Sequence, residues 1–416
     1  MKITLENFCM IKKAEIELNG ITVITGDNDS GKSTVGKALF CICNSFYNIN
    51  KEIRILKKRS IDIYINDRII PETEEIRFST PLGIFYNNEF YDDEDYETIK
   101  SWILNLNIDK ITKDKFFNEL DKIYNIPKEK ATEGIISNYL ENVFKMQINN
   151  FNLKNVNSIA KIKTQATEIE IKIKENKKIS HNLKTSFPIQ VVYIDNPNIL
   201  NENTFINYNK YSTNDYLKEL LRNKKYISLI NDILLNDKIS NAIDLIDKIA
   251  PTNIKSHRKF LKEEFINTDS KGNKLYASNL STGLKVFAII KMLLLNNALK
   301  ENTLLILDEP EIHLHPDWQI ILAEVIVLLQ RDLNLNILLT THSPYFLEAI
   351  DVYSKKHGIR EKRKYYLTRK EEEGIVFDDM TEKTVNLFKK FGESLTNLED
   401  EAHYQNTKEN ENDIYG

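Results

Sequence analysis

The residues that could do chemistry lie in two stretches, and the first is the nine-residue segment 26–34. It has two glycines with four residues between them, followed by a lysine and two hydroxyl side chains, which is typical of a loop that binds phosphate groups. Glycines let the backbone N–H groups curl toward an anion, and a helix that starts here adds its dipole. We therefore expect a nucleotide site formed by Gly26, Asn28, Ser30, Gly31, Lys32, Ser33 and Thr34.

Two side chains of this loop have the chemistry to act on a bound nucleotide. Lys32 carries a positive charge that can lie between the β- and γ-phosphates, and the Ser33 hydroxyl can bind Mg²⁺. The context fits, because an apolar run over 21–25 predicts a buried strand before the loop, and a helix is expected over about 32–45 after it. The alternative is a glycine-rich turn that carries Lys and Ser without a function.

The second stretch begins with an apolar strand, predicted over 303–307, that ends in two adjacent carboxylates. Asp308 would hold Mg²⁺ through water opposite Ser33, and Glu309 would polarise the attacking water as a general base. Adjacent carboxylates also occur at strand ends on ordinary protein surfaces. The apolar run before them and Pro310 after them disfavour that reading here.

A histidine follows another predicted core strand, which covers residues 337–341. A lone histidine is usually structural. His342, however, lies directly after a second core strand, which is the place where a sensor of the γ-phosphate is needed. We therefore expect His342 to act in catalysis together with Glu309 and Lys32.

Ser281 and Gly283 stand at the start of a helix predicted over 283–295. Ser281 is expected to be an ordinary N-cap residue, because its hydroxyl can accept a hydrogen bond from the first turn. The same hydroxyl and the N–H groups that follow it also form an anion-binding helix start. In the sharper interpretation, this anion site meets ATP that is bound to another subunit.

Composition limits the class of protein. The chain has 416 residues and a net charge of −4, with 41% hydrophobic and 28% charged residues, which is ordinary for a soluble globular protein. It shows no global basic field of the kind that binds nucleic acid, and no segment long and apolar enough to span a membrane. Three cysteines without scaffold spacing and an N-terminus without an apolar signal core suit a reducing cytoplasm. Cys41 and Cys43 are expected to be buried thiols rather than half of a metal site, because residues two apart in a helix do not share a face.

The elements that position these residues follow from hydrophobic periodicity and turn signals. We expect strands over 2–8, 15–18, 167–176 and 190–194, helices near 96–105, 113–125 and 131–148, amphipathic helix over 202–264, and a hairpin with strands at 263–268 and 274–277. They suggest a discontinuous head domain of residues 1–47, 157–200 and 264–375. Two insertions interrupt it, a mostly helical one over 48–156 and a helical one over 201–263. The polar, acidic segment 399–416 is expected to be a disordered tail.

Taken together, the motifs resemble those of ABC-type ATPases of the branch that contains RecF, SMC proteins and the OLD nucleases. The resemblance covers about residues 1–45 and 270–350, and it rests on the phosphate loop and the segments 280–283, 308–316 and 341–344. It implies an α/β fold: a P-loop ABC ATPase head, with a mixed sheet flanked by helices and an antiparallel β subdomain, carrying large and mostly helical insertions. It also implies that the chain binds ATP with Mg²⁺ and hydrolyses it.

The resemblance further implies a head-to-tail homodimer or a higher even oligomer. ATP would lie between the phosphate loop of one subunit and Ser281 and Gly283 of the other. One departure concerns the glutamine that such ATPases carry after a strand between the phosphate loop and the ABC signature, which the segment 280–283 resembles. Here the strand 190–194 is followed by Asp195, which we expect to replace it in the nucleotide site. A zinc site from His313 and His315 is the weaker reading, because no cysteine lies nearby.

The resemblance also bears on the role of the ATPase. OLD-type chains continue into a Toprim nuclease domain after the switch histidine, which His342 resembles here. Only about 70 residues follow His342, and no strand with the acidic Asp-x-Asp pattern is recognisable among them. The chain resembles the stand-alone ATPase subunits of bacterial anti-phage systems, PtuA-like in Septu or AriA-like in PARIS, which work beside a separately encoded nuclease. We therefore expect a cytoplasmic ATP-gated switch that controls such an effector and has no nuclease activity of its own.

A second hypothesis is a RecF-like DNA repair or chromosome-associated ATPase that binds DNA directly. It would need a basic groove, and the short basic clusters at 57–59 and 362–364 are better explained as solvated faces. A transporter ATPase is disfavoured by the large insertions and by the motif at 311–315.

Overall fold

The computed structural model describes residues 1–72, 93–153, 156–183, 185–201, 204–205, 211–222, 229–259, 262–269, 271–385, 387–389 and 401. The tail expected at 399–416 lies, apart from residue 401, outside the described residues. No helix in the described ranges is long and apolar enough to cross a membrane.

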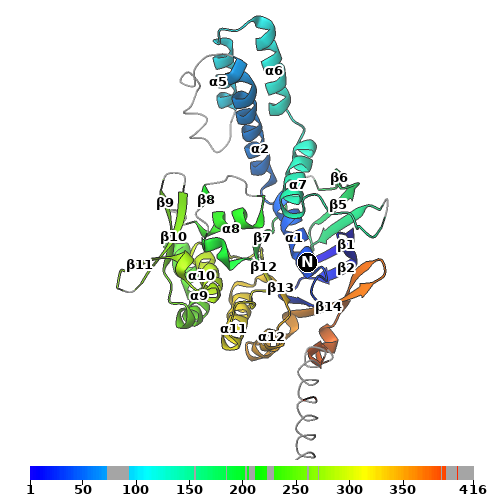
Figure 1. Ribbon diagram of the computed structural model, residues 1–416, viewed down its shortest axis with the longest axis vertical. Helices are drawn as coiled ribbons and strands as arrows, with labels where there is room; N and C mark the ends of the chain where they lie inside the picture. Colours follow the sequence, from blue (N-terminus) through cyan, green and yellow to red (C-terminus); the bar gives the residue numbers. More distant parts are fainter. Residues whose placement is uncertain are drawn as a thin grey trace, which may run out of the picture.

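A mixed sheet of eleven strands, counted over the described residues, forms the centre of the fold, in the order β6-β5-β4-β1-β2-β15-β14-β3-β13-β12-β7 (Figure 1). Its strands are β1 (Lys2–Phe8), β2 (Ile11–Glu17), β3 (Ile21–Thr25), β4 (Ser158–Lys163), β5 (Glu168–Lys174), β6 (Lys178–His181), β7 (Gln190–Ile194), β12 (Thr303–Asp308), β13 (Asn336–Thr341), β14 (Arg363–Glu371) and β15 (Gly374–Asp379).

The two halves of this sheet differ in strand direction. From β14 to β7 all neighbouring strands are parallel, and β3, β7 and β12 read as continuous buried runs because helices cover both faces. From β6 to β2 the neighbours are antiparallel, and burial alternates along β2 and β5. The mixed sheet with an antiparallel part agrees with the expected architecture.

A second, smaller sheet contains β8 (Thr204–Phe205), β9 (Ile254–Lys259), β10 (Lys262–Thr268) and β11 (Lys274–Tyr276). The hairpin expected around 270–273 is confirmed, because β10 pairs with β11 in antiparallel register. The helical expectation for 202–264 holds for α8 (Thr213–Leu221) and α9 (Leu229–Ile249). It was wrong for 204–205, which is β8, and for 254–259. That segment is β9, because antiparallel pairing with β10 satisfies its backbone groups.

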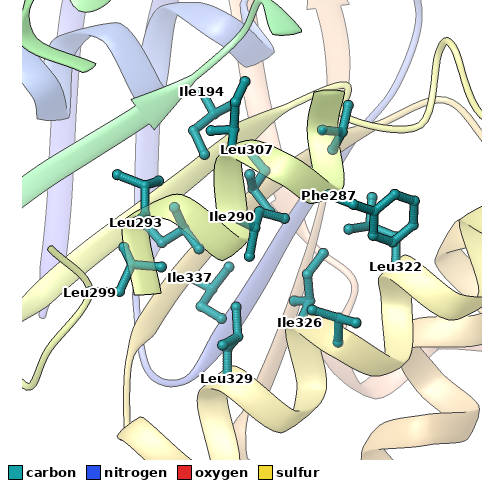
Figure 2. Close-up of a cluster of buried hydrophobic side chains, with 14 of the residues drawn as sticks. Ile194, Phe287, Ile290, Leu293, Leu299, Leu307, Leu322, Ile326, Leu329 and Ile337 are labelled. Carbon is teal, nitrogen blue, oxygen red and sulfur yellow. The ribbon is translucent and has the colours of Figure 1, made fainter. Parts of the chain in front are cut away.

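Helices pack on the two faces of the parallel strands. The helix α1 (Lys32–Phe46) lies on one face, where Val35 and Leu39 share a core with Ile306 and Leu338. On the other face, α10 (Thr282–Leu295) and α11 (Pro316–Leu333) enclose the alternate strand residues, and Figure 2 shows Ile290 among them. The remaining head helix, α12 (Pro344–Lys356), follows β13, and short 3₁₀ turns lie at Pro197–Asn201, Ala277–Asn279, Arg360–Lys362 and Thr381–Lys383. Because side chains alternate along a strand, each strand contributes to both cores.

A helical arm extends away from the sheet (blue to cyan in Figure 1). It consists of α2 (Ile49–Tyr64), a π-helical turn (Ile65–Ile69), α3 (Ile70–Glu72), α5 (Asp93–Leu104), α6 (Lys110–Tyr124) and α7 (Lys128–Phe144). The arm has its own small core, in which Ile99 and Phe116 are fully buried. The rings of Tyr96 and Tyr124 stack with their centroids 3.9 Å apart.

The cysteines Cys9, Cys41 and Cys43 are free and buried. Burial raises the pKa of Cys9 to about 12. The thiol interpretation of Cys41 and Cys43 is therefore confirmed, and neither carries a reactive thiolate at neutral pH.

We predict that Ile290→Ala lowers the free energy of unfolding by about 2–5 kcal/mol, because it leaves a cavity between α10 and the sheet. Ile290 has no exposed surface. The matched control is Ile63→Ala, since Ile63 also lies on a helix but is 61% exposed, and its effect should stay within about 0.5 kcal/mol. Urea denaturation measures both; equal losses in the two variants would contradict the assignment of this core.

Candidate functional site

The phosphate-type loop lies between β3 and α1 and contains backbone conformations that favour glycine. Gly26 has φ 143° and Gly31 has φ 76°. A Cβ atom on Gly26 would lie 1.8 Å from Oγ1 of Thr368 on β14. That same hydroxyl donates a hydrogen bond of 2.7 Å to Ser30 Oγ. The loop is thus held against β14, and its shape permits no side chain at position 26.

Lys32 is almost fully buried, with 4% of its surface exposed. Its Nζ donates to the carbonyl oxygens of Asp27 at 2.7 Å and Gly26 at 3.3 Å. Burial lowers the pKa of Lys32, and the nearby negative charges of Glu309 and Asp308 oppose that shift. The ammonium therefore lies at the loop, where phosphate oxygens can replace carbonyl oxygens as its acceptors.

Asp308 is the last residue of β12 and receives hydrogen bonds from hydroxyl groups of three other elements. Ser33 Oγ donates to Oδ1 at 2.9 Å, Tyr193 OH donates to Oδ2 at 2.6 Å, and the Thr340 hydroxyl donates to Oδ1. The structure thus brings Ser33 and Asp308 together, as the magnesium prediction requires. Hydroxyl and carboxylate oxygens are the ligands that Mg²⁺ prefers, so these two residues fit the ion.

Glu309 and His342 face each other, with 3.1 Å between Glu309 Oε1 and His342 Nε2. Glu309 has φ 50°, and its N–H donates to the Thr340 carbonyl oxygen at 3.1 Å, which fixes this uncommon backbone conformation. Burial lowers the pKa of His342; the charge of Lys32 lowers it further, while Glu309 raises it. The net direction favours a neutral imidazole beside the Glu309 carboxylate.

A cleft of about 230 Å³ opens beside Asp308 and Glu309. Asp195 belongs to its lining, and burial raises the pKa of this carboxyl group. The structure therefore brings Asp195 to the site, although it leaves its role toward a nucleotide a prediction. The lining consists of Ser33, Ile194, Asp195, Asn196, Pro197, Val286, Asp308, Glu309, Pro310, Ile312 and His313.

Ser281 and Gly283 do not line this cleft. Ser281 is the exposed N-cap of α10, and its Oγ accepts a hydrogen bond of 3.5 Å from the N–H of Leu284. Gly283 is buried, and a Cβ atom there would lie 3.0 Å from the His313 carbonyl oxygen. The N-cap interpretation of Ser281 is confirmed, whereas its contact with a second nucleotide stays a prediction. Asn28 is exposed and Thr34 half-buried in the loop.

His313 and His315 formed the weaker zinc hypothesis, and the structure does not place them in a cluster of metal-binding side chains among the residues that it describes. His315 is mostly exposed and lies 3.4 Å from Asp317. Within the described residues, no group of three or more His, Cys, Asp or Glu side chains is placed to hold a metal ion.

Three contacts at the site were missed by reasoning from the sequence: those of Tyr193, Thr340 and Thr368. They come from strands that are distant in sequence but paired with β12 or β3. One signal for Tyr193 was available, because Gly36 is a glycine inside a helix. A Cβ atom on Gly36 would lie 2.9 Å from the Tyr193 ring, so this glycine makes room for the tyrosine.

Comparison with known proteins shows the family of the chain. A protein-family model described as an AAA ATPase domain matches residues 1–347. The chain belongs to this family. The predicted fold class, an α/β P-loop ATPase with a large mixed sheet and many helices, is thereby confirmed. The family's ATPase character extends to the chain, while the roles of single residues remain to be tested.

The solved structures that are similar to this chain include heads of SMC proteins. The SMC head domain from Thermotoga maritima is 11% identical, with 91% of this chain and 97% of that chain covered and a TM-score of 0.38. An SMC head bound to the C-terminal winged-helix domain of ScpA is 12% identical, with 92% and 98% covered and a TM-score of 0.44. An SMC head with an extended coiled coil, bound to the C-terminal domain of ScpA derived from Pyrococcus furiosus, is 12% identical, with 94% and 98% covered and a TM-score of 0.43.

We predict that Tyr193→Phe raises the Kd for ATP in the presence of Mg²⁺ by about 2- to 10-fold, because Asp308 loses one of its hydroxyl donors. The Kd measured with EDTA should change less. Tyr276→Phe is the matched control, since Tyr276 is 50% exposed on β11. Titration with a fluorescent ATP analogue measures both; an unchanged Mg²⁺-dependent Kd in Tyr193→Phe would contradict the role given to Tyr193.

Proposed function

We propose that the chain binds ATP with Mg²⁺, hydrolyses it between two head-to-tail subunits, and uses this cycle to control a separately encoded effector. The observation that carries the proposal is one connected group of side chains: Ser33, Asp308 and Glu309 line one cleft, His342 contacts Glu309, and the charge of Lys32 lies close to both carboxylates. A nucleotide-binding loop alone would not require the second carboxylate or the histidine. Their contact with each other supports hydrolysis rather than binding alone.

In this proposal, each residue has a separate task. The N–H groups of the loop and Lys32 bind the β- and γ-phosphates, while Ser33 and Asp308 hold Mg²⁺, which neutralises phosphate charge when bound. Glu309 orients the attacking water and takes its proton. His342, held neutral, donates from Nε2 either to Glu309 or to a γ-phosphate oxygen. Asp195 lies at the side of the cleft and contacts the nucleotide or its water.

The position of Ser281 supports a site shared by two subunits. It stands exposed at the start of a 14-residue helix, outside the cleft that contains Ser33. A helix start presents N–H groups and a partial positive charge to an anion. The apolar Ile312, 62% exposed on the loop after Glu309, provides further surface for a second copy of the chain.

The effector is proposed from the architectural resemblance to the stand-alone ATPase subunits of Septu and PARIS, and we infer a nuclease in cytoplasmic anti-phage defence. Direct DNA binding is disfavoured at the 362–364 cluster. Arg363 is paired with Asp351, and Lys364 Nζ lies 3.0 Å from Glu17. These charges neutralise carboxylates of the same chain, so they are poorly placed to neutralise phosphates.

We predict that Glu309→Gln binds ATP with near-normal Kd but lowers kcat by about 10²- to 10⁴-fold, because the amide cannot accept the proton of the attacking water. Closed dimers should therefore accumulate with ATP and Mg²⁺. Light scattering coupled to size exclusion measures the dimer, and phosphate release measures turnover. Normal turnover in this variant would mean that another group is the base.

We predict that Ser281→Arg keeps nucleotide binding but abolishes hydrolysis, because the arginine blocks the surface that meets the other subunit's ATP. Lys32→Ala should abolish ATP binding. A mixture of the two variants should regain activity, since one of the two shared sites then combines an intact loop with an intact Ser281. Absence of any recovery, with mixed dimers demonstrated by differential tagging, would overturn the shared site.

A further inference from the structure

Glu311 is a buried carboxylate that has no role in the proposed reaction. It lies two residues after Glu309 and is only 4% exposed. Its Oε1 accepts hydrogen bonds from the Thr341 hydroxyl and, at 3.2 Å, from the backbone N–H of His342. Its Oε2 is buried and has no hydrogen-bond partner within the described part of the chain.

Burying a carboxylate in this way lowers the stability of the folded protein. Taking a carboxylate out of water costs several kcal/mol unless a cation compensates for it, and in the described residues no salt bridge involves Glu311. Burial raises the pKa of Glu311, and the charge of Glu309 raises it further, while the hydrogen bonds from Thr341 and from backbone N–H groups lower it. An apolar side chain of similar size would fill this space at lower cost, which indicates that the oxygen positions matter.

The hydrogen bonds of Glu311 join two loops of the site. One loop carries Glu309 after β12, and the other carries His342 after β13. The connection reaches the phosphate loop as well, because the Thr25 hydroxyl donates to the Thr341 carbonyl oxygen at 3.0 Å and Thr25 precedes Gly26. Oε1 of Glu311 thus fixes the backbone of His342 relative to the loop that carries Glu309.

The same loop also contacts the start of α10. The N–H of Leu314 donates to the Glu311 carbonyl oxygen at 2.9 Å, and the His313 carbonyl oxygen lies where a side chain on Gly283 would be. Gln319 extends the connection: its Nε2 donates to the Leu314 carbonyl oxygen at 3.1 Å, and its Oε1 accepts from Ser343 Oγ at 2.6 Å. A shift at the start of α10 therefore reaches both the Glu311 loop and the residue after His342.

We propose that Glu311 is a positioning residue for ATP hydrolysis, which holds His342 and Glu309 in register and links them to the signature end of α10. The inference rests on the proposed function of the same site. Glu311 acts through an oxygen at a fixed place rather than through its charge. A glutamine, which offers an amide oxygen in the same place, should therefore substitute for it, whereas a leucine of similar size should not.

The test compares Glu311→Leu with the conservative Glu311→Gln in the full-length protein. Glu311→Leu should lower kcat on the order of 10- to 100-fold, the loss expected when a catalytic group moves by about 1 Å, with an unchanged Kd for ATP and Mg²⁺. Glu311→Gln should restore most of that kcat. Glu348→Leu, which removes an exposed carboxylate from α12, serves as the surface control.

Thr341→Val provides a second line of evidence, because it removes the hydroxyl donor and keeps the side-chain shape. It should lower kcat in the same direction, and combining it with Glu311→Leu should add little, as for two residues that act as one unit. Thermal melting of every variant shows whether assays are made on folded protein. If Glu311→Leu folds and keeps normal kcat, or if Glu311→Gln loses as much as Glu311→Leu, the positioning role is wrong.

These outcomes differ from failure of the proposed function. If the shared-site ATPase itself is wrong, Glu309→Gln and Lys32→Ala keep the wild-type rate, or the wild type has none. If only the Glu311 inference is wrong, Glu309→Gln and Lys32→Ala still lose turnover, while Glu311→Leu keeps normal kcat or Glu311→Gln loses as much as Glu311→Leu.

Discussion

The contact between Asp308 and the hydroxyl of Ser33 organises the whole site. It connects the end of β12 to the first turn of α1, two segments that are 275 residues apart in sequence. Tyr193 and Thr340 hold the same carboxylate from the strands on either side. A carboxylate with three hydroxyl donors keeps its charge satisfied while staying at the mouth of the cleft. The phosphate loop, Glu309 and His342 lie around it.

This contact depends on the register of four parallel strands. Asp308 is opposite Thr340, Thr341 is opposite Thr25, and Leu307 is opposite Ile194. The carboxyl ends of β3, β7, β12 and β13 therefore meet at one edge, and the residue after each strand reaches the site. A shift of one residue in β13 would turn its core side chains to the opposite face of the sheet, so burial of the strand protects the geometry of catalysis.

What the sequence could predict was the local part of this arrangement. The loop at 26–34, the Asp308–Glu309 pair and His342 each follow an apolar strand, and such a pattern can be read without knowing the fold. The partners of these residues could not be read in this way. Tyr193 and Glu311 matter because strand order and loop packing bring them beside Asp308 and Thr341, and nothing in their own neighbourhood of the sequence indicates it. The strand at 254–259 was mistaken for helix for the same reason, since its pairing with β10 decides its conformation.

The helical arm begins where α1 ends, so α1 joins the arm to the phosphate loop. The helix α1 starts at Lys32 in the phosphate loop and ends at Phe46. Only two residues separate its end from the start of α2. The last helix of the arm, α7, packs against α1. The Phe40 and Tyr139 rings meet edge to face with their centroids 5.7 Å apart, and Cys41 Sγ donates to the Tyr139 carbonyl oxygen at 3.6 Å. This packing makes α1 a continuous, buried link between the phosphate loop and the base of the arm. The arm is therefore connected to the candidate site through α1, although none of its described residues lines the cleft.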